Sequence, residues 1–278
     1  MDQYNLVAGR VARLVTTSYS TSFGTATKLF SKAIRQDIYN IYGLVRIADE
    51  IVDTYLGSDA AQQLDALEQE TYRALQYGYS ANLIVHAFAT TAQRYNIGKD
   101  LIKPFFYSMR LDTKPQHYTP ELYARYIDGS AEVVGLMCLK VFVTSKAEFS
   151  HLEPAARALG AAFQKVNFLR DLAADHANLE RYYFPGSTFA TFNDTVKATI
   201  IADIEADFAV ARQAMAQLPS SARPAVTAAY NYYARLLKKL KQASAIDLLS
   251  KRLRVNNAVK LGLLGRTIIA AKLPKARL

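Results

Sequence analysis

A stripe of polar side chains between Gly160 and Pro185 constrains this sequence more than any other feature. The polar residues recur at intervals of three, four and four positions, which is the spacing of one helix face. They are Gln164, Asn167, Asp171 and Asp175. Two carboxylates one turn apart can share a hard cation through oxygen ligands, and amides one and two turns earlier can hold whatever the cation binds. The segment therefore predicts a helix with a cation-binding stripe.

A second polar stripe lies upstream, within residues 37–53. Its members are separated by four, three and four positions: Tyr42, Arg46, Asp49 and Asp53. Isoleucine and valine supply an apolar face for the same helix. Each stripe ends in two aspartates with an arginine beside them, so two such helices facing each other predict a diphosphate–magnesium site. One aspartate alone would be ordinary surface charge, and it is the repetition that favours a site.

Both motifs resemble those of the squalene/phytoene synthase family, whose members join prenyl diphosphates head to head. RIADEIVD resembles the DxxxD that follows YxxxR in that family, and QKVNFLRDLAAD resembles its QxxNxxRDxxxD. Further agreement comes from RYYFP at 181–185, SYSTSF at 18–23, GSAEVVG at 129–135 and KRLRVNNAVKL at 251–261. The resemblance runs from about residue 16 to residue 264 and is strongest to bacterial phytoene synthases.

The resemblance implies an all-α fold, a single-domain bundle of the isoprenoid-synthase type around a central cavity, over residues 1–278. It implies Mg²⁺, with Mn²⁺ as a substitute, held by Asp49, Asp53, Asp171 and Asp175. It implies catalytic roles for Tyr42, Arg46, Arg170 and Tyr183. It implies diphosphate contacts by Ser22, Arg46, Gln164, Asn167, Arg170, Arg181 and Arg254. No nicotinamide cofactor is expected.

The resemblance favours a phytoene synthase, which joins two geranylgeranyl diphosphates through a cyclopropylcarbinyl (prephytoene) diphosphate in carotenoid biosynthesis. The turn at 24–27 consists of small residues, and we expect Thr27 to border a pocket for the longer chain. One alternative is a farnesyl-using relative that makes squalene or dehydrosqualene. A second is a catalytically inactive helical scaffold, against which the intact acids argue. A third, a basic lipid- or nucleic-acid-binding module, leaves the acidic stripes unexplained.

Two positions depart from the family pattern. Asp128 stands where the family often has an aromatic residue or histidine, and the spacer from Asp175 to Arg181 is one residue longer than in many relatives. The small residues that follow Asp128 permit the close approach of either a neighbouring helix or an isoprenoid chain. They include Gly129, Ala131 and Gly135.

The remaining sequence is typical of a helical globule. Apolar residues make up 51% of the chain, and strand alternation is absent. We expect a hydroxyl-rich turn at 16–24 and helices at 3–16, 32–56, 81–95, 99–111, 120–143 and 195–217. The single Cys138 excludes an internal disulfide. His86, His117, His151 and His176 lack metal-ligand spacing.

The net charge of +10 is distributed unevenly. From Arg235 onward, twelve basic residues accompany one acid, Asp247. Such a tail is typical of contact with an anionic membrane or of a solvated face, whereas no nucleic-acid-binding motif accompanies it. Because no signal peptide or membrane-spanning run is apparent, we predict a cytoplasmic protein. Peripheral contact with the inner face of the membrane and a solvated basic face are both left open.

Overall fold

The computed structural model describes residues 1–19, 21–55, 57–254, 256 and 262, without the side chains of 21–23. These residues form helices and no strand, which confirms the all-α prediction. The helices are α1 (Asp2–Tyr19), α2 (Thr21–Thr27), α3 (Lys32–Asp53), α4 (Ala60–Tyr77), α5 (Leu83–Arg94), α6 (Lys99–Leu111), α7 (Pro120–Ile127), α8 (Val133–Phe142), α9 (Lys146–Leu179), α10 (Asp194–Ala214), α11 (Arg223–Gln242) and α12 (Ala245–Ser250). That residues 1–278 form one domain stays a prediction.

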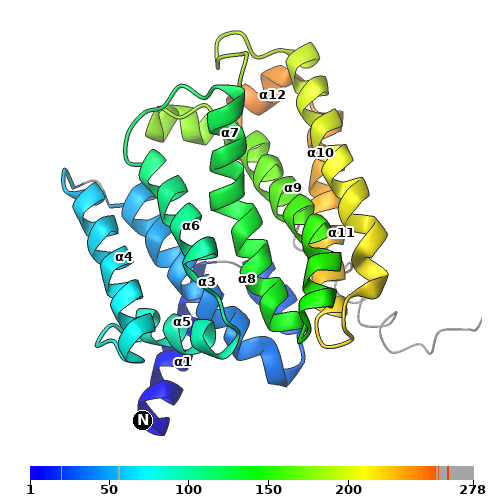
Figure 1. Ribbon diagram of the computed structural model, residues 1–278. Helices are drawn as coiled ribbons and strands as arrows, with labels where there is room; N and C mark the ends of the chain where they lie inside the picture. Colours follow the sequence, from blue (N-terminus) through cyan, green and yellow to red (C-terminus); the bar gives the residue numbers. More distant parts are fainter. Residues whose placement is uncertain (20, 56, 255, 257–261, 263–278) are drawn as a thin grey trace, which may run out of the picture.

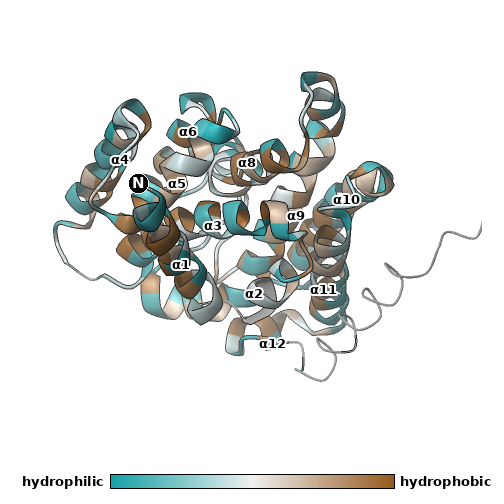
Figure 2. Ribbon diagram, turned by 90° about the horizontal axis from the view of Figure 1, so that it is seen from below, coloured by the Kyte–Doolittle hydropathy of each residue, from teal (hydrophilic) through white to brown (hydrophobic). Residues whose placement is uncertain are grey.

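Helices α3 and α9 occupy the middle of the bundle. In both Figure 1 and Figure 2, α4–α6 lie on one side of this pair and α10 and α11 lie on the other. One cluster of buried side chains joins α1, α3, α4, α5, α6 and α8 with the first part of α9 and of α11, and a second joins α7, α10 and α12 with the remainder of α9 and α11. The segments of α3 and α9 that carry the two polar stripes therefore pack into different halves of the core.

The sequence of α3 explains why this helix is central. Its buried apolar residues recur at helical spacing: Ile34, Ile38, Ile41, Leu44, Ala48 and Val52. Burial of one such side chain contributes about 1.5–3 kcal/mol relative to leaving it exposed. Since the apolar face fixes the rotation of the helix, the adjoining stripe with Arg46 and Asp49 is left available for chemistry.

Helix α9 spans 34 residues and has a defined start and end. The Ser145 hydroxyl caps its first turn by accepting a bond of 3.1 Å from the Glu148 amide. At the other end Glu180 adopts a left-handed conformation with φ of 52°. The Arg181 amide then donates to the Asp175 carbonyl over 3.1 Å. This reversal turns the following chain back toward the C-terminal ends of the neighbouring helices.

Glycines allow three helices to approach one another closely. A Cβ on Gly129 would lie 2.1 Å from the Pro104 carbonyl oxygen on α6, and one on Gly160 would lie 2.6 Å from the Ala131 carbonyl oxygen. These contacts support the prediction of close helix packing around Gly129. The continuous helix predicted over 120–143 instead contains a π-helical segment, Asp128–Glu132, between α7 and α8.

The predicted hydroxyl-rich turn at 16–24 is wrong. Helix α1 continues to Tyr19, and α2 begins at Thr21. The threonines are compatible with the helix because their hydroxyls donate back to carbonyls one turn earlier. Thr16 donates to Ala12 over 2.9 Å and Thr17 to Arg13 over 3.0 Å. The other helix predictions are confirmed to within a few residues.

Candidate active site

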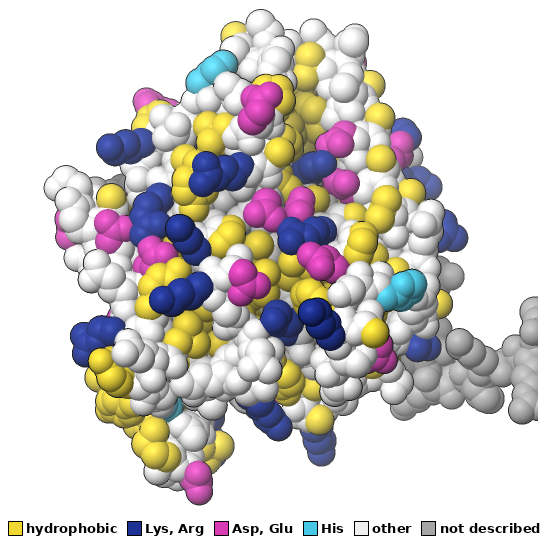
Figure 3. All heavy atoms as spheres, viewed as in Figure 1, with side chains coloured by type: hydrophobic (Ala, Val, Ile, Leu, Met, Phe, Trp, Pro, Cys, Tyr) yellow, Lys and Arg dark blue, Asp and Glu magenta, His cyan; other side chains and the backbone are white. Residues whose placement is uncertain are grey.

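The C-terminal halves of α3 and α9 bring the two acidic stripes together. Burial raises the pKa of Asp175 to about 7, with further repulsion from Asp171 on its own helix and from Asp53 on α3. Burial and the charge of Asp53 likewise raise the pKa of Asp49 to about 7. The four carboxylates therefore share one electrostatic environment, as the sequence predicted. On the face of the molecule that Figure 3 shows, acidic side chains lie among lysines and arginines.

The arginines of the stripes lie beside the acids. Arg46 pairs with Glu50, and its Nη1 lies 3.9 Å from Asp49 Oδ2. The Nε of Arg46 is buried and has no hydrogen-bond partner among the described atoms. On α9, Arg170 Nε donates to Asp171 Oδ1 over 2.8 Å. Both guanidinium groups thus lie where they could also reach diphosphate oxygens.

Arg252 reaches the acidic stripes, whereas Arg254 was the arginine predicted from the sequence. Arg252 follows α12, and its Nε lies 2.6 Å from Asp171 Oδ1. The Arg254 side chain is exposed, and its carbonyl accepts a bond of 2.7 Å from Lys239. Both arginines stand in the same short motif, so the register of side chains after α12 could be decided only in three dimensions.

Arg181 and Tyr183 lie beneath the acids in a buried cluster around Asp112. The Arg181 guanidinium donates to Asp53 Oδ1 over 2.6 Å and to the Asp112 carbonyl over 2.7 Å. Tyr183 donates to Asp112 Oδ1 over 3.2 Å and stacks on Phe168 with 3.8 Å between ring centroids. Asp112 was not predicted from the sequence, because it stands alone after α6, outside any periodic stripe.

The other selected residues have different surroundings. Tyr42 and Gln164 line the apolar cavity described below. Asn167 Oδ1 is buried without a hydrogen-bond partner among the described atoms. Ser22 belongs to α2, but its side chain lies outside the described residues. Asp128, the departure from the family pattern, is held by Arg157 of α9 over 2.7 Å.

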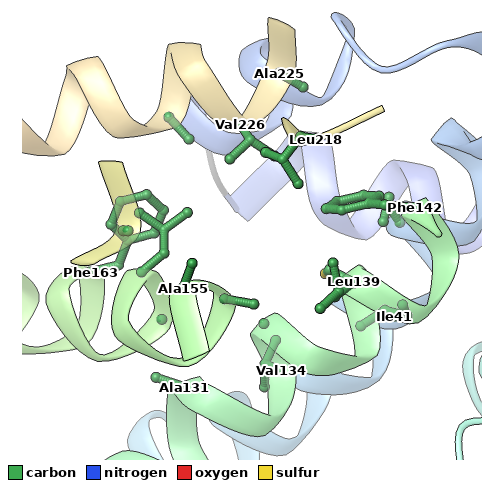
Figure 4. A pocket seen from close by; sticks show the side chains of 18 of the residues that line it. Ile41, Ala131, Val134, Leu139, Phe142, Ala155, Phe163, Leu218, Ala225 and Val226 are labelled. Atoms are coloured by element: carbon green, nitrogen blue, oxygen red, sulfur yellow. The ribbon is translucent and has the colours of Figure 1, made fainter. Parts of the chain in front are cut away.

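The cavity lies next to the acidic stripes and has a volume of about 260 Å³. Its wall is almost wholly apolar and comes from α2, α3, the π-helical segment, α8, α9, α10 and α11. Figure 4 shows Phe163 and Phe142 on opposite sides of it. As predicted, Thr27 belongs to the wall, and so do Ala131 and Gly135. The small residues after Asp128 therefore serve both helix packing and the cavity.

Helices α3 and α9 both lead from the cavity to the acids. On each helix, the residues that line the cavity come before the aspartates in the chain. On α9 the lining extends from Leu152 to Gln164, a length of about 18 Å at about 1.5 Å per residue. Asp171 follows two turns later. An elongated apolar group in the cavity would thus place a polar head attached to its end beside the acids.

The donor set of the two stripes fits a magnesium ion. Carboxylate oxygens are the ligands that Mg²⁺ prefers, and the Asp175 carboxylate makes no direct hydrogen bond or ion pair among the described residues. Within the part of the chain that the structure describes, no three His, Cys, Asp or Glu side chains already enclose a metal position. Asp53 is instead paired with Arg181. Asp171 is paired with both Arg170 and Arg252. A metal ion would compete with these arginines for the carboxylates.

Comparison with known families agrees with the motifs and the fold. The family model for squalene/phytoene synthase matches residues 16–258. The chain belongs to this family. Its members are prenyl transferases that use prenyl diphosphates. No helix among the described residues is long and apolar enough to cross a membrane.

Several relatives of known name are similar in sequence. The 15-cis-phytoene synthase of Paracoccus sp. (strain N81106 / MBIC 01143) is 28% identical over 273 residues, 90% of this chain and 87% of that protein. The 15-cis-phytoene synthase of Synechococcus elongatus is 33% identical over 65% of this chain and 62% of its own length. The 4,4'-diapophytoene synthase of Staphylococcus haemolyticus is 25% identical over 66% of this chain and 65% of that protein.

A solved structure shares the fold. A dehydrosqualene synthase in complex with a ligand superimposes with a TM-score of 0.81 and 19% identity, covering 97% of this chain and 98% of that one. A squalene synthase of Alicyclobacillus acidocaldarius superimposes with a TM-score of 0.73. These similarities establish the isoprenoid-synthase type of helical bundle.

Proposed function

We propose that this protein is a phytoene synthase that joins two geranylgeranyl diphosphates head to head. The observation that carries the proposal is the junction of a long apolar cavity with two facing acidic stripes, at which Tyr42 and Gln164 belong to both. Named phytoene synthases among the relatives add support. A prenyl diphosphate has the matching form, with a highly charged head on a long apolar chain.

The proposed reaction has two stages. In the first, the C1–O bond of one substrate breaks, diphosphate leaves, and the allylic cation alkylates the C2–C3 double bond of the second substrate. Loss of a proton closes the cyclopropane ring of the cyclopropylcarbinyl diphosphate. In the second stage the remaining diphosphate leaves, the skeleton rearranges to join the two C1 carbons, and loss of another proton forms the central double bond. No hydride donor is needed.

The chain's own residues would act on the diphosphates and the cations. Arg46 and Arg170 would donate to diphosphate oxygens as negative charge develops on them, and Arg252 is positioned to join them. Gln164 and Asn167 would orient the head, since both stand on the stripe before the acids. The apolar wall would shield the cations from water. Magnesium bound by Asp49, Asp53, Asp171 and Asp175 would supply Lewis-acid stabilisation of the leaving diphosphate.

The preference for geranylgeranyl diphosphate rests on the cavity wall near α2. Ala26 and Thr27 contribute small side chains there, so the wall leaves room that a phenylalanine would fill. An apolar pocket discriminates by only about 1–3 kcal/mol per methylene. We therefore expect slow turnover of farnesyl diphosphate beside the preferred substrate.

A farnesyl-using enzyme is the second candidate. The 4,4'-diapophytoene synthase among the relatives and the dehydrosqualene synthase among the solved structures favour it. It would use the same acids and arginines with a shorter apolar chain. The two candidates therefore differ in the depth of the cavity and not in its polar end.

Direct competition tests the proposal. Purified protein with Mg²⁺ is given farnesyl and geranylgeranyl diphosphate at equal concentration, with and without a reduced nicotinamide cofactor, and the hydrocarbons are identified. Phytoene as the main product under both conditions supports the proposal. A predominant farnesyl-derived hydrocarbon would replace it with the second candidate, and cofactor-dependent squalene would identify the reducing branch.

A further inference from the structure

Arg181 joins the ends of three helices beneath the acidic stripes. It follows the C-terminus of α9, and its Nη2 donates to the carbonyls of Val52 on α3 and Asp112 at the end of α6, each over 2.7 Å. A cation at the C-terminal end of a helix interacts favourably with unsatisfied carbonyls and with the helix dipole. The guanidinium of Arg181, which stands just after α9, thus stabilises the C-terminal ends of α3 and α6.

The same guanidinium holds a proposed metal ligand. Its Nη1 lies 2.6 Å from Asp53 Oδ1, so its two terminal nitrogens donate to the side chain of Asp53 and to the backbone of α3 and α6. Arg181 is buried, with 8% of its surface accessible to solvent. With these donors in use and the group buried, Arg181 is poorly placed to bind diphosphate, the role that the sequence analysis gave it.

Asp112 holds Arg181 from below. Its carboxylate has 7% exposure, and Asp112 Oδ1 lies 3.8 Å from Arg181 Nε. Tyr126 donates to the second oxygen over 2.5 Å, while Tyr183 donates to the first. Because Tyr183 also stacks on Phe168 of α9, the network extends from α7 through α6 to α9. Such a rigid base fixes both the position and the rotation of the guanidinium.

We propose that Arg181 and Asp112 form a buried positioning pair that sets the separation of the two acidic stripes and so the affinity of the site for divalent metal. The pair acts through Asp53 and through the ends of α3 and α9, without touching the substrate. This inference rests on the proposed function only where it takes the four aspartates as metal ligands. It assigns Tyr183 to the same support instead of to catalysis.

The chain offers a matched control for this pair. Lys165, also on α9, is a buried cation with 9% exposure, and it pairs with Asp203 and Asp207 of α10 over 2.6 and 2.8 Å. Its removal costs a buried ion pair between two helices but touches neither acidic stripe. Loss of stability alone should therefore appear in Lys165→Gln, whereas loss of metal binding should be specific to the pair.

The experiment measures Mn²⁺ binding to the full-length protein in the presence of inorganic diphosphate, by titration calorimetry and by electron paramagnetic resonance of free Mn²⁺. Arg181→Lys keeps the charge but lacks the planar fork whose two terminal nitrogens reach Asp53 and both helix ends. We expect it to weaken Mn²⁺ binding by about 10–100-fold, the usual range for a residue that orients a metal ligand. Lys165→Gln should bind Mn²⁺ as tightly as the unmodified protein does. Its midpoint of thermal unfolding should fall by about as much as that of Arg181→Lys.

Asp112→Asn is the second variant, and it tests the role of the pair in metal binding if Arg181→Lys does not fold. It keeps the size and an acceptor for the tyrosines but loses the charge that holds Arg181, so Mn²⁺ binding should fall by about tenfold. Unchanged binding in a folded variant overturns the inference. So does an equal loss in Lys165→Gln, or absence of Mn²⁺ binding in the unmodified protein. Normal binding without hydrocarbon formation would overturn the proposed function and leave this inference intact.

Discussion

Phe30 stacks on Phe142 at the wall of the cavity, with 5.3 Å between the ring centroids and 28° between the ring planes. Phe30 follows α2 and Phe142 ends α8, and both line the cavity. Figure 4 shows Phe142 on the side opposite Phe163, the lining aromatic nearer to the acids on α9. We infer that the stacked pair closes the cavity at the end farthest from the acids.

Truncation of this wall should lengthen the chain that the enzyme accepts. In Phe142→Ala the cavity gains the volume of a ring, so turnover of a prenyl diphosphate one isoprene unit longer should rise relative to geranylgeranyl diphosphate. Phe142 is partly buried, so its loss should also lower the stability, by less than the roughly 3–5 kcal/mol that a fully buried aromatic costs. Product lengths from paired assays check the first effect and thermal unfolding the second. Unchanged product lengths in a folded Phe142→Ala variant would contradict the assignment of this wall.

Thr27→Phe should have the opposite effect. A phenyl group at this buried position would fill part of the cavity and shift the preference toward farnesyl diphosphate. Because an apolar pocket discriminates by about tenfold or more per methylene, we expect a shift of at least about tenfold. Thr27 has a polar partner in the structure, so Thr27→Val, which removes the hydroxyl at similar size, is the control. The competition assay should show a shift only for Thr27→Phe. Equal shifts in both variants would assign the effect to the lost polar contact.

Turnover should need a divalent metal and both acidic stripes. Asp49→Asn and Asp171→Asn keep the size of the side chain but remove a ligand charge, so each should lower kcat by about a hundredfold or more, as for a removed electrostatic stabiliser. Chelation of metal should abolish turnover reversibly. Circular dichroism verifies that the variants remain folded. Near-normal turnover in both would rule out the metal assignment.

Gly129→Ala should destabilise the bundle. The added Cβ would lie 2.1 Å from the Pro104 carbonyl oxygen and 2.2 Å from Ser108 Oγ, so α6 and the π-helical segment must separate. Overpacking of this kind costs about 1–3 kcal/mol. In Gly24→Ala the new Cβ would lie 3.4 Å from Thr17 Cα, an ordinary contact, and this variant serves as the control. Equal thermal midpoints for the two variants would contradict the close packing.

Binding to acidic vesicles should weaken as salt rises, if the basic C-terminal region meets anionic lipid. Much of that region lies outside the described residues, and within it Arg252 and Lys251 are paired with Asp171 and Asp247. A second surface could also contact lipid. Among the described residues, six large apolar side chains are exposed in or next to α1 and around the connection from α4 to α5. They are Met1, Leu6, Leu14, Tyr19, Tyr77 and Tyr79. The N-terminal end of α1 projects from the bundle in Figure 1.

Two variants separate this apolar surface from the basic tail. Leu14→Asp should reduce vesicle binding if α1 inserts into the interface, whereas Val210→Asp on α10, an exposed apolar position elsewhere, should not. Co-sedimentation with neutral and acidic vesicles at rising salt measures both. Equal binding to both kinds of vesicle, or none, would leave the basic region as a solvated face.

The sequence by itself determined the helical class and the polar end of the site. Stripes such as Asp49–Asp53 and Asp171–Asp175 are local in the chain, and helical periodicity alone places their members on one face. The cavity position of Thr27 was also predicted, because the resemblance aligned its segment with a pocket wall. The turn at 16–24 was wrong, since threonine hydroxyls can bond to helix carbonyls as well as cap a turn.

Only the tertiary structure decided how the site is supported. Asp112 and Arg181 stand 69 positions apart, and neither belongs to a repeating pattern. The contact of Arg252 with Asp171 was not predicted, because exposed side chains after a helix carry no periodicity. Contacts of this kind depend on where separate helices end in space. Helix ends are positioned by packing across the whole core, and a local sequence pattern holds no record of that packing.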